Sequence, residues 1–128
     1  MPEALRCELF PDDLDAAVAF YVDVLGFAVT RDERSTEASY VALRRGGVRL
    51  GLAARPAPEH PELRRPPTGV ELVLEVGDLD AAHAHVRAAG WPLAEDLTDR
   101  PWGLRDFRLV DPHGYYWRLT TGEGTAGC

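Results

Sequence analysis

Hydrophobic and polar residues alternate along two short segments of the chain, and a helical pattern follows each of them. In residues 5–10 and 70–76 about every second side chain is apolar, which is typical of a half-buried strand. After each segment an aspartate precedes apolar residues spaced three or four positions apart. We therefore expect helices that begin after Asp13 and Asp78, with these aspartates as N-caps.

Each helix is expected to end at a glycine, Gly26 or Gly90, because a helix end often requires a positive φ. Short apolar segments then indicate three further strands in each half of the chain. They are residues 27–31, 40–43 and 48–52 in the first half and 91–95, 107–110 and 115–120 in the second. The glycine-containing segments 45–47 and 111–114 are the expected hairpin turns.

The chain therefore repeats one unit. Residues 13–20 recur as 78–85, and residues 48–52 are similar to 115–119. Five of the 10 prolines lie between the two halves, which indicates a linker. We expect one domain over residues 1–128, and its parts are module one (about 4–53), the linker (about 54–68), module two (about 69–121) and a tail (122–128).

Alternation divides the strand side chains between two faces of a sheet. The face expected to pack on the helices carries Leu5, Cys7, Leu9, Leu50, Leu52, Leu72, Leu74, Val76, Trp117 and Leu119. The opposite face carries Arg6, Glu8, Phe10, Arg49, Gly51, Glu71, Val73, Glu75, Tyr116 and Arg118. A sheet face with charged and aromatic side chains is a candidate ligand site, and the alternative is that these residues only face solvent.

Composition narrows the function classes. With 21 acidic and 14 basic residues the net charge is −7, which disfavours a nucleic-acid binder or an anionic-membrane binder. All the basic residues are arginines, so lysine-dependent Schiff-base chemistry is excluded. No apolar run has the length that spans a membrane, and two cysteines do not make a disulfide framework. We also expect no secretory leader. We expect a soluble cytoplasmic protein.

Two groups of residues resemble a known family. The first is Phe20-Tyr21 with Leu25-Gly26-Phe27, and the second is Pro101-Trp102-Gly103 with Phe107 and Asp111-Pro112-His113-Gly114. They are similar to the glyoxalase/bleomycin-resistance/dioxygenase (vicinal oxygen chelate) superfamily, and the second group resembles its bleomycin-resistance-like branch. The resemblance covers about residues 4–120. It implies an α+β fold in which two tandem βαβββ modules form a curved mixed sheet, with a concave ligand cleft and helices on the outer face.

The same resemblance places the metal ligands of the family's metalloenzymes on the first and last strand of each module. The matching residues here are Arg6, Gly51, Glu71 and Arg118. Only Glu71 can ligate a metal, because arginine has no available lone pair and glycine has no side chain. We therefore expect no metal and no cofactor.

A cluster of Arg6, Glu71 and Arg118, joined by Glu8 and Arg49, stands where the metal would be. One interpretation is a salt-bridge network that fills an unused site, and the other is a set of arginines that bind an oxyanion of a ligand. The resemblance implies that Trp102 stacks on the ligand. Phe10, Tyr40, Phe107 and Tyr116 could add aromatic walls, whereas the polar loop 32–38 argues against bleomycin itself.

The leading hypothesis is a metal-independent binding protein that sequesters an antibiotic or another aromatic, oxyanion-bearing natural product. The alternative is an enzyme of the same superfamily, a lyase, isomerase or dioxygenase-like protein with Glu71 or Glu8 as weak candidates for a catalytic base. A further alternative is a structural or regulatory dimer without ligand. The expected partners are a small molecule and a second copy of the chain, with no nucleic acid and no membrane.

Overall fold

The computed structural model describes residues 3–54 and 68–122 and divides into two compact units, residues 1–65 and 66–128. The first unit contains β1 (Cys7–Leu9), α1 (Leu14–Ala19), η1 (Phe20–Val24), β2 (Ala28–Glu33), β3 (Tyr40–Arg45) and β4 (Val48–Ala53). The second contains β5 (Leu72–Glu75), α2 (Leu79–Ala88), β6 (Glu95–Asp99), β7 (Arg105–Val110) and β8 (Tyr116–Thr120). Residues 55–67, most of the expected linker, lie outside the described residues.

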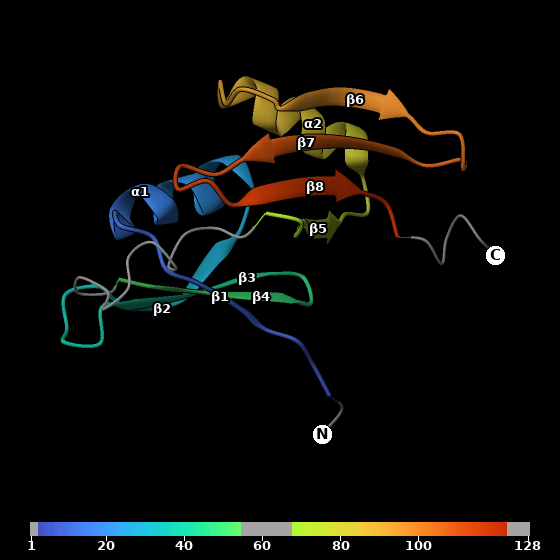
Figure 1. The fold of residues 1–128 in the computed structure, drawn as a ribbon. Coiled ribbons are helices and arrows are strands. Elements are labelled where there is room, and N and C mark those ends of the chain that lie inside the picture. The colour runs from blue at the N-terminus through green and yellow to red at the C-terminus, as the bar shows by residue number, and fades with distance from the viewer. Residues whose placement is uncertain (1–2, 55–67, 123–128) are drawn as a thin grey trace. The chain divides into compact units, whose positions relative to one another are not determined.

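Each unit forms one four-stranded mixed sheet, and the two sheets have the same topology (Figure 1). The strand order is β1-β4-β3-β2 in the first unit and β5-β8-β7-β6 in the second. The first strand of each unit pairs parallel to the last strand, and the other pairs are antiparallel. The predicted α+β fold with two βαβββ modules is confirmed.

The helices begin and end where the sequence predicts. The Asp13 carboxylate accepts a hydrogen bond from the Ala16 amide at 3.0 Å, and Asp78 accepts one from Ala81 at 2.9 Å. Gly26 and Gly90 follow the helices with φ of +73° and +76°. The end of the first helix widens into a π-helical turn, η1, whose first two carbonyls, of Phe20 and Tyr21, accept hydrogen bonds from the Leu25 and Phe27 amides.

Apolar side chains pack between each sheet and its own helix. The buried set includes Leu9, Tyr21, Leu25, Leu43, Leu50 and Leu52 in the first unit and Leu74, Val86, Phe107, Leu109, Trp117 and Leu119 in the second. Leu5, which was expected on the packed face, is 95% exposed because β1 begins only at Cys7. Figure 1 shows α2 lying along one face of the second sheet.

The predicted strand over residues 91–95 is wrong. The Trp91 amide still bonds to the Val86 carbonyl at the end of α2, and Pro92 has no N–H to donate to a sheet. The ladder to β7 therefore starts at Ala94, whose amide bonds to the Arg108 carbonyl at 2.8 Å. The strand itself spans Glu95–Asp99.

A β-bulge in β2 changes which side chains lie on the sheet face opposite the helix. Val29 pairs with Leu43, but the next paired residue is Arg31, which lies opposite Ala42. The extra residue, Thr30, donates its hydroxyl to the Ala42 carbonyl at 3.1 Å. Because a one-residue shift exchanges the two faces, the bulge brings Arg31 onto the same face as Ala42.

Replacing the first N-cap tests the structural role of the repeated aspartate. The Asp13→Ala substitution removes the acceptor of the Ala16 amide, so the free energy of unfolding should fall by about 1 kcal/mol. Urea denaturation followed by circular dichroism measures the change. The matched control is Asp12→Ala, which removes the same charge from an exposed neighbour that does not cap the helix. Equal losses in both variants would contradict the capping role.

Candidate functional site

The first unit has an open sheet face, which we define as the face opposite its own helix. It carries Arg6, Glu8, Tyr40, Ala42, Arg44, Arg49 and Gly51, together with Arg31. At its centre the Tyr40 hydroxyl donates to the Glu8 carboxylate, 3.0 Å from Oε2 and 3.2 Å from Oε1. Burial raises the pKa of the Tyr40 hydroxyl, and the hydrogen bond to Glu8 raises it further. Tyr40 is therefore a neutral donor at pH 7.

Gly51 allows this arrangement. It lies opposite Glu8 in the β1–β4 pair and opposite Ala42 in the β3–β4 pair. A Cβ at this position would overlap both the Glu8 carboxylate and the Tyr40 hydroxyl. The absent side chain therefore makes the space in which the Glu8–Tyr40 pair lies.

Three arginines lie side by side at one end of the open face, and we call them the arginine row. Arg44 of β3 pairs directly with Arg49 of β4, and Arg6 immediately precedes Cys7, whose partner in β4 is Leu50. Arg6, Arg49 and Arg44 therefore occupy neighbouring positions on three adjacent strands. Like charges placed directly opposite each other destabilise a sheet.

The arginine row lines an open hollow of about 280 Å³ that belongs entirely to the first unit. Its charged and aromatic lining residues are Arg6, Arg31, Tyr40, Arg44 and Arg49. The Arg31 guanidinium lies 5.5 Å from the centre of the Tyr40 ring, which is a cation–π contact. The hollow thus combines several guanidinium groups with one aromatic wall.

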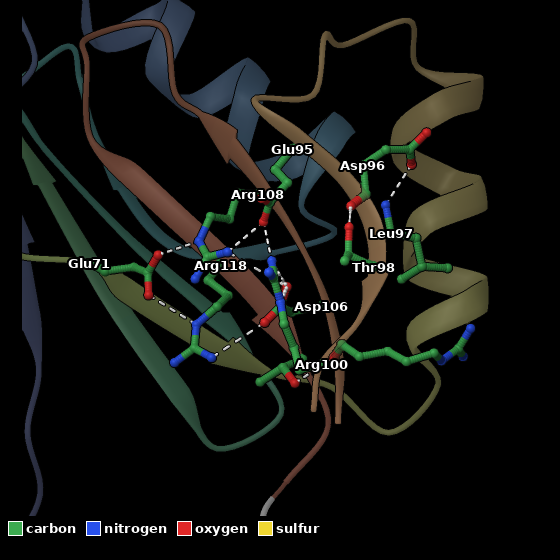
Figure 2. Close-up of polar contacts among 11 residues, drawn as sticks. Glu71, Glu95, Asp96, Leu97, Thr98, Arg100, Asp106, Arg108 and Arg118 are labelled. Carbon is green, nitrogen blue, oxygen red and sulfur yellow. Dashed lines mark hydrogen bonds and ion pairs between the residues drawn. The ribbon is translucent and has the colours of Figure 1, made fainter. Parts of the chain in front are cut away.

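The open face of the second unit, again the face opposite its own helix, carries acidic residues and arginines that contact one another (Figure 2). Three acids and three arginines form a continuous set of ion pairs, the six-charge network. They come from β6, β7 and β8 and from the residues just before β5 and just after β6: Glu71, Glu95, Arg100, Asp106, Arg108 and Arg118. The formal charges of these six residues cancel.

Glu71 is held at both oxygens. Arg108 Nε lies 2.7 Å from its Oε2, and Arg118 Nε lies 2.9 Å from its Oε1. Arg108 also contacts Glu95 at 2.6 Å, and Arg100 contacts Glu95 as well. The Glu71 hydrogen bond raises the pKa of Arg108, and the Arg100 and Arg108 hydrogen bonds lower the pKa of Glu95.

Asp106 is the buried centre of the network, with a side chain only 1% exposed. Arg100 lies 2.7 Å away, Arg118 3.5 Å and Arg108 3.7 Å. Burial raises the pKa of its carboxyl, but the Arg100 hydrogen bond and the nearby guanidinium charges outweigh burial, so the pKa lies below its ordinary value. Asp106 therefore remains ionised at pH 7.

The residues of the predicted cluster belong to two different units. Glu71 and Arg118 contact each other in the second unit, whereas Arg6 and Glu8 form a looser pair at 3.5 Å in the first. Six residues of the two open faces were not among the predicted site residues: Arg31, Arg44, Glu95, Arg100, Asp106 and Arg108. The alternation of Asp106 and Arg108 with apolar neighbours along residues 105–110 was a signal for two of them.

The predicted aromatic residues lie in different environments. Phe107 is fully buried and its ring contacts the ring of His83 on α2, so its prediction as a wall of the open face is wrong. It pairs with Leu119, and both residues point to the helix. Trp102 is 64% exposed in the turn that precedes β7, Tyr116 is 37% exposed and Phe10 is half-buried.

The four positions at which the resemblance places metal ligands do not fit a metal ion. Arg6 and Arg118 offer no lone pair, and a side chain at Gly51 has no room. Both Glu71 oxygens are already bound by arginines. Among the described residues, no three His, Cys, Asp or Glu side chains gather as a potential metal site.

The family model for the glyoxalase/bleomycin resistance protein/dioxygenase superfamily matches residues 4–119. The chain belongs to this superfamily. No curated protein matches the sequence. Within residues 3–54 and 68–122, no helix has both the length and the apolar character needed to cross a bilayer.

Solved structures of the superfamily are similar along almost the whole chain. TioX from Micromonospora sp. ML1 has a TM-score of 0.75 and 25% identity, over 94% of this chain and 98% of that one. A superfamily member from Sphaerobacter thermophilus has a TM-score of 0.68 and 23% identity, over 95% of this chain and 98% of that one. Lactoylglutathione lyase from Agrobacterium tumefaciens has a TM-score of 0.67 and 24% identity, over 95% of this chain and 96% of that one. The last two likenesses concern the fold alone.

The buried carboxylate of the network predicts a pH-dependent loss of stability. The Asp106→Asn substitution leaves three guanidinium groups without their shared anion, so unfolding at pH 7 should require about 3 kcal/mol less. The folded pKa of Asp106 lies below its ordinary value of 3.8. The contribution of its charge to stability is therefore complete above the ordinary value, and it is lost as the pH falls from there through the folded pKa.

Urea denaturation at pH 7 and pH 3 measures this difference. The gap between the wild type and Asp106→Asn should shrink at pH 3, because this pH lies below the ordinary pKa and the unfolded chain then binds a proton at Asp106. Asp99→Asn, in an exposed position of β6, is the matched control and should leave stability nearly unchanged. An Asp106→Asn deficit of the same size at both pH values would show that its charge is not the cause.

Proposed function

We propose that the protein binds a small aromatic molecule that carries an oxyanion, without a metal, and that it sequesters such a compound. The observation that carries this proposal is the arginine-lined hollow beside Tyr40 in the first unit. Guanidinium groups form bidentate, charge-assisted hydrogen bonds with carboxylate, sulfate or phosphate groups. The Tyr40 ring, which the Arg31 guanidinium contacts at 5.5 Å, supplies an aromatic edge for the ring of the ligand.

The contrast between the two units supports the first unit as the ligand site. In the six-charge network every arginine contacts a carboxylate of the same unit. The arginines of the hollow are less compensated, because Arg6 and Arg31 have loose carboxylate partners at 3.5 Å and 3.6 Å. No described residue provides a carboxylate for Arg44 or Arg49. A bound anion would provide the missing acceptor.

An acid–base enzyme is the second candidate, and the Glu8–Tyr40 pair favours it. A carboxylate and a hydroxyl joined at 3.0 Å beside several guanidinium groups resemble a base, an acid and an oxyanion partner. Glu71 is a weaker candidate for the base because two arginines hold it. The two functions differ in the fate of the ligand, which a binding protein releases unchanged.

Titration calorimetry with 2-naphthoate tests ligand binding and its independence of metal. Arg49→Ala should weaken binding about tenfold or more, because a charged hydrogen bond contributes roughly 1.5–3 kcal/mol. Arg87→Ala on α2, an exposed arginine of the other unit, is the matched control and should bind like the wild type. Dialysis against EDTA, or the addition of Zn²⁺, should not change the affinity. A chelator-sensitive affinity, or none at all for the wild type, would contradict the proposal.

The role of Trp102 as a stacking residue stays a prediction. Its 64% exposure leaves the indole accessible, and stacking would add about 1 kcal/mol beyond burial of area. Trp102 belongs to the second unit, whereas the hollow is lined by residues of the first unit alone, so its stacking role is tested separately. An aromatic acid should change the tryptophan fluorescence of the wild type and not that of Trp102→Phe. An equal change in both proteins would contradict the stacking role.

The homodimer also remains part of the proposal. Analytical sedimentation reports it directly, because the chain has a mass of 14.1 kDa.

A further inference from the structure

The arginines around the hollow differ in whether they have a carboxylate partner. Arg6 lies 3.5 Å from Glu8, and Arg31 lies 3.6 Å from Glu33, so each of these arginines has one carboxylate. Arg44 donates its Nε to the Gly46 carbonyl at 2.8 Å, which is a neutral partner, and Arg49 has no ion-pair partner among the described residues. Within residues 3–54 and 68–122, the positive charges of Arg44 and Arg49 therefore have no carboxylate partner.

These two arginines are also cross-strand partners. Arg44 and Arg49 lie directly opposite each other in the β3–β4 hairpin, and both side chains are exposed on the open face. Directly opposed like charges destabilise a sheet unless an anion lies between them. The Arg44–Gly46 hydrogen bond fixes one guanidinium near the hairpin turn. The backbone pairing thus places two exposed arginines on adjacent strands at the edge of the hollow.

We propose that Arg44 and Arg49 together bind the dianionic phosphate of a single-ring aromatic phosphate monoester, with Tyr40 beside the ring. This inference rests on the proposed function and specifies its ligand class. A phosphate monoester carries a charge close to −2 at neutral pH and three terminal oxygens. It therefore matches the two positive charges of the arginines and offers three acceptor oxygens to their N–H groups, whereas a carboxylate has one charge and two oxygens.

The size of the hollow supports a small ligand. Its volume of about 280 Å³ lies just below the usual range for ligand pockets, roughly 300–1,000 Å³. A single-ring phosphate fits this space better than a large polycyclic compound. The Tyr40 ring is covered by the Arg31 guanidinium at 5.5 Å, so the ligand ring has an aromatic edge and a cation as neighbours.

Titration calorimetry at pH 7.5 with phenyl phosphate, benzoate and inorganic phosphate tests the inference. Phenyl phosphate should bind at least tenfold more tightly than benzoate, because it contacts both arginines through charged hydrogen bonds. It should also bind more tightly than inorganic phosphate, which lacks the ring. Arg44→Ala and Arg49→Ala should each reduce the phenyl phosphate affinity at least tenfold, and Arg87→Ala should not.

Thermal denaturation separates a ligand-binding pair from a structural one. Without ligand, Arg44→Ala and Arg49→Ala should melt at the wild-type temperature or above it, because each removes a like-charge contact. Phenyl phosphate should raise the melting temperature of the wild type and of Arg87→Ala, but not that of the two hollow variants.

Each failure points to a different conclusion. If benzoate and phenyl phosphate bind equally well, the dianion inference is overturned while the proposed function stands. If phenyl phosphate binds tightly but Arg44→Ala and Arg49→Ala do not weaken it, the assignment to this pair is overturned. If neither benzoate nor phenyl phosphate binds at millimolar concentration, both the inference and the proposed function fail.

Discussion

A guanidinium group on a sheet face needs an anion, and the two units satisfy this need in different ways. Arginine remains charged at every accessible pH, so deprotonation cannot relieve repulsion between neighbouring arginines. In the second unit, three carboxylates of the same unit neutralise three arginines, with Asp106 buried at the centre. In the first unit, Arg44 and Arg49 face each other without a carboxylate between them among the described residues. This difference is the reason why we propose the open face of the first unit as the ligand site.

The same scaffold supports both solutions. Both sheets have the same strand order, both helices begin at an aspartate cap, and both end at a glycine with positive φ. The helix-facing side chains form the core and are apolar in both units. The opposite faces are free to differ because they carry little of the packing. A fold of this kind can therefore exchange one site chemistry for another without losing its core.

Membership of the glyoxalase/bleomycin resistance protein/dioxygenase superfamily establishes the architecture, whereas the chemistry depends on individual side chains. At the four family positions this chain has two arginines, a glycine and a glutamate whose oxygens are bound by arginines. Glu8 and Tyr40 lie over Gly51, in the space that a longer side chain at that position would need. Ion pairs and hydrogen bonds within each unit thus stand at positions where the family's metalloenzymes have metal ligands.

The sequence by itself determined the repeat, the two helices with their caps, most of the strands and the apolar faces. These features follow from local rules, the period-two and helical spacings and the backbone preferences of aspartate and glycine. Only the tertiary structure decided which charged side chains meet. The bulge at Thr30 brings Arg31 to the open face, the register of β7 with β8 buries Phe107, and Arg108 lies between Glu71 and Glu95. Strand register and bulges depend on pairing between distant segments, and a shift of one residue exchanges the two faces.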